Sequence, residues 1–358
     1  MVVIHIANID RSLIGGVQIA VPQMVKAQSR HATVGFINTH GDCIDGVTML
    51  HLSSGEGVRD LPPPFNRPDL VVFHEVYRFE FIKIYKMLRR EGIPYVIIPH
   101  GCLSREAQKR KRLKKLSANI LFFRSFMKGA KCIQYLSPNE VKLSAFSKYP
   151  HIVYGNGVDI PTLDDRRFEG DNIRFVYIGR MEIVTKGLDL LLGAVKQSEG
   201  TMRKLGATLE IYGPEYNGEH RCLRELADKY GISDLVRIDK EKMGEEKKRI
   251  LLSSDCFIQA SRTEAMPLGP IEALSYGLPC IVSRGVGLGD VVESYGAGLQ
   301  CDTSADGISI AINKFMASYQ DAKKMSESAI KLVCDNFDRN RFAEETVKGY
   351  CQLIKNNH

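Results

Sequence analysis

Apolar, β-branched runs alternate in this chain with amphipathic stretches of helical length, and this alternation constrains the fold class most strongly. In the first half the runs are VVIHIAN, ATVGFIN, DLVVFH, PYVIIPH and CIQYLS, with helical patterns at 17–29, 79–91 and 138–148. Unbroken apolar strands separated by helices are typical of parallel sheets that are buried on both faces. A second series follows, with strands IRFVYIG, ATLEIYG, LVRID, CFIQAS and CIVS. The sequence therefore predicts an α/β fold.

The length of 358 residues exceeds what one hydrophobic core usually serves and fits two domains with a cleft between them. The polar stretch PTLDDRRFEGDN (161–172) has turn formers and no apolar period, so we expect a linker there. We expect a first Rossmann-like domain over 1–152 and a second over 153–339. The tail 305–357 has helical spacing throughout, and its last helix, at about 340–358, is expected to pack back on the first domain.

Composition excludes several classes of protein. With 44% hydrophobic and 25% charged residues the chain is typical of a soluble globular protein, and no run of about 18 apolar residues predicts a membrane-spanning helix. The N-terminus lacks a basic flank and a cleavage site, so it is predicted to be a buried strand. Nine cysteines without a C-x-x-C pair favour reduced, mostly buried thiols over metal or disulfide roles, as in the cytoplasm.

The net charge of +7 is concentrated in one segment, which indicates an anionic partner: Lys109, Arg110, Lys111, Arg112, Lys114 and Lys115. An apolar, partly amphipathic stretch follows, so residues 105–128 are a candidate face for an anionic membrane surface. A solvated charged helix remains an equal alternative. A nucleic-acid partner is not predicted, because aromatic interleaving, zinc-ligand spacing and RNA-recognition motifs are missing.

Two glycines, Gly15 and Gly16, follow the first predicted strand and precede a predicted helix. Glycine lets backbone amides approach an anion at a helix N-terminus, although a plain tight turn explains the pair equally well. The dinucleotide fingerprint G-x-G-x-x-G is absent, which argues against a redox cofactor.

The segment YIGRMEIVTKG places Arg180 and Lys186 in a short loop after a strand. Two cations at a strand end suit a diphosphate, since Arg binds oxygens bidentately and Lys adds a mobile point charge. Two solvated surface charges are the alternative.

The segment SRTEAMPLGPIEALS follows another strand and opens a helix. Glu264 is expected in the turn, where it can accept hydrogen bonds from sugar hydroxyls, and Glu272 in the first helical turn, where it can reach a ribose diol. Amides near Met266, Leu268 and Gly269 could meet phosphate oxygens. A helix with an acidic first turn, favoured by its dipole, is the alternative.

Together, G-R-x5-K-G, the following E-x7-E and the N-G-V-D at 156–159 resemble the GT-B retaining glycosyltransferases of family 4 (glycosyl transferases group 1), of the bacterial surface-polysaccharide type. The resemblance covers most of the chain and is strongest over 152–300. It implies that Arg180 and Lys186 bind the donor diphosphate. It also implies that Glu264 holds the donor sugar and that Glu272 binds the ribose. It also implies that Gly15 and Gly16 are the family's glycine loop, and that His100 in IIPHGCLS contacts the transferred sugar; the residues alone suggest an ordinary strand-end histidine.

The resemblance implies a UDP- or GDP-sugar as co-substrate, no cofactor and no metal, since no D-x-D-like pair ends a strand of the second domain. The implied acceptor is a glycan or a polyprenyl-diphosphate-linked glycan in polysaccharide (O-antigen or capsule) assembly, at the cytoplasmic face of the plasma membrane. A nucleotide-sugar epimerase or a phosphorylase of the same fold, and a non-catalytic membrane-surface binding protein, stay open. One departure is Glu264-Ala265-Met266-Pro267 in place of E-G-F-G, because Pro267 offers no backbone donor.

Overall fold

A computed structural model describes residues 1–12, 15–53, 55–109, 112–162, 168, 172–215, 217–264 and 266–355. The chain forms two compact units, of which unit 1 comprises Met1–Asn156 with Arg339–His358 and unit 2 comprises Gly157–Asp338. The boundaries expected from the sequence were after residues 152 and 339. Most of the expected linker, at 163–167 and 169–171, lies outside the described residues.

Unit 1 is built on a parallel sheet of six described strands in the order β2-β1-β3-β4-β5-β6. These strands are β1 Val2–Ala7, β2 Thr33–Asn38, β3 Leu70–His74, β4 Tyr95–Ile98, β5 Cys132–Tyr135 and β6 His151–Val153. Alternate residues point to opposite faces. One face carries a continuous apolar core that includes Ile4, Ile6, Phe73 and Ile97. Their neighbours His5 and His74 consequently belong to the other face.

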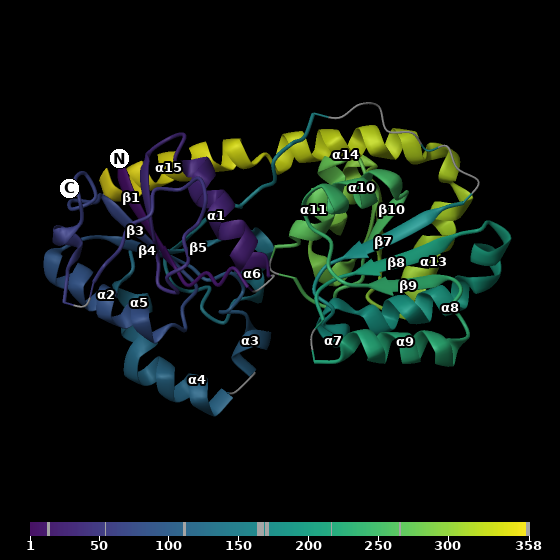
Figure 1. The fold of residues 1–358 in the computed structure, drawn as a ribbon, viewed down its shortest axis with the longest axis horizontal. Helices are drawn as coiled ribbons and strands as arrows, with labels where there is room; N and C mark the ends of the chain where they lie inside the picture. The colour runs from purple at the N-terminus through teal and green to yellow at the C-terminus, as the bar shows by residue number, and fades with distance from the viewer. Residues whose placement is uncertain are drawn as a thin grey trace. The chain divides into compact units, whose positions relative to one another are not determined.

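The helices of unit 1 follow the strands in sequence, and the last one returns from the far end of the chain (Figure 1). The described helices are α1 Gly16–Gln28, α2 Phe79–Glu91, α3 Arg105–Lys109, α4 Arg112–Ala118, α5 Arg124–Gly129, α6 Pro138–Leu143 and α15 Arg339–Lys355, with a π-helical turn at Asn119–Phe123. The yellow helix α15 contacts α1, which follows the first strand. The first and last segments of the chain are therefore parts of one packed unit.

Unit 2 repeats the architecture with six described parallel strands in the order β12-β11-β10-β7-β8-β9. The strands are β7 Arg174–Ile178, β8 Thr208–Tyr212, β9 Val236–Asp239, β10 Cys256–Gln259, β11 Cys280–Ser283 and β12 Gly298–Cys301. The helices are α7 Ile183–Lys186, α8 Leu188–Lys204, α9 Glu219–Tyr230, α10 Gly244–Ser253, α11 Leu268–Ser275, α12 Gly289–Tyr295, α13 Ala305–Ala317 and α14 Ala322–Asn336. Apolar cores cover both faces of this sheet.

The predicted α/β fold with two Rossmann-like domains is confirmed, and each expected strand is present. Two strands were not expected, namely β6 and β12 at the sheet edges. The helix expected over 138–148 is shorter, because it ends at Leu143 and Ser144 has an extended conformation. The tail is helical as predicted, in α13, α14 and α15.

All nine cysteines are free thiols. Four are buried, whereas Cys43, Cys222 and Cys334 are exposed, so the expectation of mostly buried thiols is wrong for these three. Within the described ranges, no helix is both long and apolar enough to cross a membrane.

Candidate functional site

The sheet of unit 2 has its topological switch point between β7 and β10. From β7 the chain proceeds to β8 and β9 on one side, and from β10 to β11 and β12 on the other. In open parallel sheets, ligands bind at the carboxyl ends of the strands at such a point. The loops after β7 and β10 carry the predicted donor-site residues, so the topology brings these two sequence segments together.

Lys186 and Glu264 form an ion pair at this point. The Lys186 ammonium donates to Glu264 Oε1 at 2.5 Å, and the two side chains are only 16% and 14% exposed. Lys186 is the last residue of α7, and Glu264 follows β10. Screening by water is weak at this exposure, so the attraction between the two charges is stronger than in an exposed ion pair.

The Glu264 carboxylate has further donors. Ser261 Oγ donates to Oε1 at 2.9 Å and Gln259 Nε2 donates at 3.3 Å. The Glu264 amide also donates to the carbonyl of Gly285 at 3.1 Å. Sequence reasoning missed Gln259 and Ser261, which orient the carboxylate beside Lys186.

The G-R-x5-K-G pattern ends in Gly187, and the structure shows why this position is a glycine. It ends α7 with φ of 65°, in the left-handed region that favours glycine. A Cβ there would lie 2.1 Å from the carbonyl oxygen of Ala260, at the end of β10. The absence of a side chain therefore lets the Lys186 loop lie against the loop that carries Glu264.

Arg180 lies at the open side of the same loop. Its side chain is 48% exposed, and the Glu182 carboxylate lies 4.0 Å away. The buried Tyr177 hydroxyl donates to the Arg180 carbonyl at 2.9 Å and so holds the backbone of the turn. Burial, with the charge of Glu264 as a second cause, raises the pKa of Tyr177 well above its usual value, so this hydroxyl keeps its proton.

Glu272 is paired with a residue that sequence reasoning missed. Lys247 in α10 donates from Nζ to Glu272 Oε2 at 2.5 Å. Helix α11 begins at Leu268 after Pro267, and its first turn contains no acidic residue. The expectation that Glu272 lies in the first helical turn is thus wrong, because that turn is formed by residues 268–271.

The backbone amides predicted to bind phosphate, at the start of α11, differ in whether they already have a hydrogen-bond acceptor. The Leu268 amide donates to the carbonyl of Met266 at 3.1 Å, so it already has a backbone acceptor. Pro267 is buried at the N-cap of α11, where its missing N–H leaves no donor. Gly269 is partly exposed and lies near the carbonyl of Ile178, at the end of β7. Ala265 lies outside the described residues.

Gly15, Gly16 and His100 belong to unit 1, apart from the unit that carries the other candidates. Gly15 caps α1 with an extended backbone, and a Cβ on Gly16 would meet nothing within 4 Å. His100 follows β4 with φ of 49°, an uncommon conformation for a residue with a side chain. The next amide, of Gly101, donates to the buried Glu140 carboxylate at 2.5 Å, which holds this turn in place.

His100 is the end of a row of three histidines. Its Nε2 lies 2.9 Å from His74 Nδ1, and His74 Nε2 lies 2.9 Å from His5 Nδ1. Burial lowers the pKa of His5 and of His100 to about 4 and that of His74 well below its usual value. All three rings are therefore neutral at neutral pH. Sequence reasoning missed His5 and His74, whose signal was a histidine within or at the end of two neighbouring strands.

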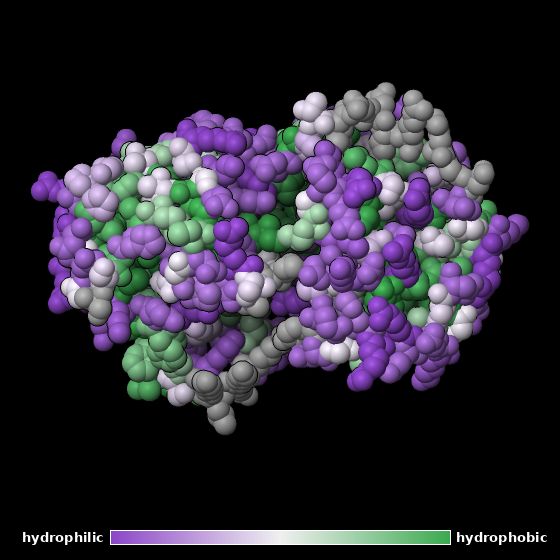
Figure 2. Space-filling model, viewed as in Figure 1, coloured by the Kyte–Doolittle hydropathy of each residue, from purple (hydrophilic) through white to green (hydrophobic). Residues whose placement is uncertain are grey.

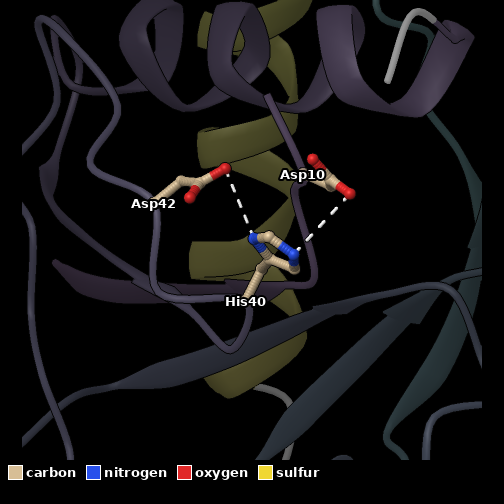
Figure 3. A group of neighbouring side chains, drawn as sticks. All are labelled: Asp10, His40 and Asp42. Carbon is tan, nitrogen blue, oxygen red and sulfur yellow. Dashed lines mark ion pairs between the residues drawn. The ribbon is translucent and has the colours of Figure 1, made fainter. Parts of the chain in front are cut away.

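A second group in unit 1 has the composition of a metal site. Figure 3 shows His40 between Asp10 and Asp42, with ring-to-carboxylate distances of 3.6 and 3.3 Å. The potential ligand atoms lie within 4.8 Å of one another. Both carboxylates already accept backbone hydrogen bonds, Asp10 from Ser12 and Asp42 from Arg11. The arrangement is explained by these contacts and the ion pairs.

The predicted membrane-facing segment presents apolar side chains. Leu116, Ile120, Leu121 and Phe122 are exposed, and Phe79 of α2 packs against Phe122 with ring centroids 5.6 Å apart. Figure 2 shows green side chains at the lower edge of unit 1, over α4 and the π-helical turn. We call these five residues the apolar patch. Of the predicted cations, Arg110 and Lys111 and the side chains of Arg112 and Lys114 lie outside the described residues.

Comparison with known proteins follows the same division of the chain. Residues 162–332 match the family described as "Glycosyl transferases group 1". Among curated proteins, the chain is 26% identical over 203 residues to the MMP alpha-(1->4)-mannosyltransferase of Mycolicibacterium hassiacum, over 55% of this chain and 47% of that protein. It is also 26% identical over 218 residues to the GDP-mannose:cellobiosyl-diphosphopolyprenol alpha-mannosyltransferase of Xanthomonas campestris, over 60% and 56%. The chain thus spans about half the length of these relatives.

Among solved structures, Anabaena Alr3699/HepE in complex with UDP and glucose superposes with a TM-score of 0.72 at 15% identity, over 97% of this chain and 98% of that one. This similarity covers both units and concerns the fold. The chain has the GT-B fold of two Rossmann-like domains, and the part that matches the glycosyl transferases group 1 family lies within unit 2.

Proposed function

We propose that this chain is a retaining, metal-independent glycosyltransferase that moves a sugar from a UDP- or GDP-sugar to a glycan or a polyprenyl-diphosphate-linked glycan. The single observation that carries the proposal is the Lys186–Glu264 pair at the carboxyl ends of β7 and β10. It places a diphosphate-binding cation beside a hydroxyl-binding carboxylate at the position where this type of sheet binds ligands.

Different residues of unit 2 bind different parts of the nucleotide-sugar donor. Arg180, whose side chain is about half exposed, binds the diphosphate together with Lys186. Glu264 accepts hydrogen bonds from the donor sugar, and Glu272 accepts them from the ribose. The Gly269 amide supplements the phosphate contacts, because Gly269 lies against the end of β7 and the Leu268 amide already donates to the carbonyl of Met266.

The reaction proceeds on one face of the donor sugar. The bond between the anomeric carbon and the phosphate oxygen breaks, and a bond from the acceptor oxygen to the same carbon forms. The acceptor hydroxyl proton passes to the departing phosphate oxygen, so the products are the glycoside and the protonated nucleoside diphosphate. Arg180 and Lys186 stabilise the negative charge that grows on this oxygen, which is the main contribution of the protein to the rate.

Two product measurements test this mechanism. The purified chain is incubated in EDTA with the donor that it consumes and a hydroxyl acceptor, and the anomeric configuration of the product is read by NMR coupling constants. We expect the product to keep the anomeric configuration of the donor sugar, and the rate in EDTA to equal the rate without EDTA. An inverted product would overturn the retaining mechanism, and recovery of activity only after adding Mg²⁺ or Mn²⁺ would overturn metal independence. Conversion of the donor sugar without an acceptor would identify an epimerase instead.

The names of the relatives support the substrate class. One relative is named for GDP-mannose and a diphosphopolyprenol, and the solved structure of similar fold was determined with UDP and glucose. We propose a role in bacterial polysaccharide assembly, such as O-antigen or capsule, on this basis.

We also propose that unit 1 contacts an anionic membrane surface from the cytoplasmic side through the apolar patch. The patch is flanked by the exposed cations Arg124 and Lys128, and this combination of apolar and basic side chains suits an anionic lipid surface. The test is co-sedimentation with phosphatidylglycerol vesicles, with phosphatidylcholine vesicles as the comparison. Ile120→Asp should reduce binding to the anionic vesicles, whereas Ile310→Asp, at an exposed isoleucine of unit 2, should not. Equal binding of wild type and Ile120→Asp would contradict the proposal.

A further inference from the structure

Three histidines of unit 1 stand side by side on one face of its sheet. In the parallel register His5 is opposite Val72, His74 is opposite Ile98, and His100 follows two residues after Ile98. Residues two apart along a strand share a face, so the three rings step across β1, β3 and β4 on the same side. Their ring centroids are 5.2 Å apart in each pair. His5 and His74 are completely buried, while His100 is partly exposed.

The row continues from His5 into the interior of unit 1. His5 Nε2 lies 3.0 Å from Gln28 Oε1 in α1. Gln28 is buried, and the oxygen of its amide can only accept a hydrogen bond. The row of histidines therefore ends at a fixed acceptor.

This fixed end determines the direction of the hydrogen bonds. Because an amide oxygen accepts, Gln28 Oε1 receives the hydrogen of His5 Nε2–H. A neutral imidazole has one donor and one acceptor nitrogen.

The same rule carries the direction to the end of the row. His5 Nδ1 accepts from His74 Nε2–H, and His74 Nδ1 accepts from His100 Nε2–H. The remaining ring nitrogen, His100 Nδ1, is left with a lone pair. No residue within the described ranges hydrogen-bonds to this atom.

We propose that Gln28, His5 and His74 are positioning residues that fix the tautomer of His100, with its hydrogen on Nε2 and its lone pair on Nδ1. His100 consequently acts as a hydrogen-bond acceptor, and the ligand group that it meets is a donor such as a hydroxyl. A phosphate or carboxylate oxygen is disfavoured there, because it would face a lone pair. In this respect the inference rests on the proposed function, with the sugar or the acceptor supplying the hydroxyl.

The tautomer can be measured without any substrate. Two-bond ¹H–¹⁵N correlation spectra of the full chain with ¹⁵N-labelled histidine distinguish the Nε2–H, Nδ1–H and doubly protonated rings. The His100 signals are assigned by their loss in His100→Gln. We expect the Nε2–H tautomer of His100 from pH 8 down to pH 5.5. The Nδ1–H tautomer or a cation over this range would overturn the proposal.

Gln28→Met tests whether the direction is set through the row. This change removes the oxygen that accepts from His5 Nε2–H and should populate the Nδ1–H form of His100. Gln134→Met is the matched control, since Gln134 is also a buried glutamine of unit 1 but its side chain bonds to Tyr350 and to the carbonyl of Tyr154. An unchanged His100 tautomer in Gln28→Met, or an equal change in Gln134→Met, would overturn the positioning role. Should Gln28→Met not fold, the wild-type spectrum still decides the direction.

Turnover gives a second readout. Loss of one orienting hydrogen bond should lower kcat about five- to tenfold in Gln28→Met with little change in donor KM, since the change affects the orientation of His100 and leaves the donor contacts in place. A rise in KM alone would contradict a role through His100. If no donor is consumed while the His100 tautomer is as expected, the proposed function is contradicted and the positioning role of the histidine row is supported. If a donor is consumed but His100 has the other tautomer, the positioning role is contradicted and the proposed function is unaffected.

Discussion

Lys186 and Glu264 contact each other directly, with 2.5 Å between Nζ and Oε1, although 78 residues separate them in the sequence. The adjacency of β7 and β10 makes this contact, and the glycine at 187 permits the close approach of the two loops. A diphosphate that approaches Lys186 therefore also approaches Glu264. The Lys186 ammonium then contacts both the diphosphate and the Glu264 carboxylate, so donor binding affects the orientation of that carboxylate.

Lys186→Ala should reduce turnover more than donor binding. The charge on the departing phosphate grows during the reaction, so we expect kcat to fall by about 100-fold or more and the Kd of the nucleotide to rise by less than about tenfold. Steady-state kinetics and calorimetric titration measure the two. Lys196→Ala is the control, because Lys196 is an exposed lysine of α8 that pairs with Glu199. Equal losses in kcat and in nucleotide affinity would contradict the assigned role.

Lys247→Ala should weaken nucleotide binding through Glu272. Without the 2.5 Å ion pair the carboxylate loses its oriented partner, and we expect the Kd to rise about three- to tenfold, which is about 1 kcal/mol. The neighbouring Lys248, which pairs with Glu245 at 3.6 Å, provides the control variant Lys248→Ala. Lys247→Ala should add little to Glu272→Ala in the double variant. Fully additive effects would mean that Lys247 acts elsewhere.

Gly187→Ala should destabilise unit 2. The new Cβ would meet the Ala260 carbonyl, and φ of 65° is strained for alanine, so we expect a loss of about 2 kcal/mol or more. Gly200→Ala is the matched control: Gly200 lies inside α8 with nothing within 4 Å of its added Cβ, and alanine should stabilise the helix by up to about 1 kcal/mol. Urea unfolding followed by circular dichroism gives the free energy of unfolding of each variant. The same midpoint for both variants would show that the close approach of Gly187 to the Ala260 carbonyl does not affect stability.

The stability of unit 1 should decrease as the pH falls below about 6.5. Burial lowers the pKa of His5 to about 4 in the folded state, so the unfolded state binds more protons between these values. His5 alone accounts for a loss on the order of 3 kcal/mol across this window, and His74 and His100 act in the same direction. Urea midpoints at pH 7, 6 and 5 measure the effect. A flat profile would contradict it, and the exposed His51, changed to Gln, should leave the profile unaltered.

Strand positions followed from apolar runs, and the two missed strands show where that signal is weak. β6 has three residues and its Val153 is exposed, so it lacks an apolar run. β12 begins with Gly298, whose φ of 153° and whose close approach to the Cys280 carbonyl exclude a side chain. In both cases the neighbouring strand, rather than local propensity, determines the structure.

The candidate site could be predicted one residue at a time, but its contacts could not. The sequence indicates that Lys186 and Glu264 follow strands, whereas their pairing requires the order of strands in the sheet. Lys247 reaches Glu272 from a different helix, and nothing in the local pattern of α10 marks it. The direction of the histidine row depends on Gln28, which lies in a different element from His5, His74 and His100. Long-range packing supplies each of these relationships.

The central claim is that unit 2 binds and activates a nucleotide-diphosphate sugar through the residues at the ends of β7 and β10. The most direct measurement incubates the purified chain in EDTA with UDP-, GDP- and ADP-sugars and follows thermal stabilisation and release of free nucleotide, for wild type and Glu272→Ala. The account predicts a selective response to one donor in the wild type and its loss in Glu272→Ala. If no donor stabilises the fold or is consumed, or if Glu272→Ala responds like the wild type, the assigned donor site is contradicted.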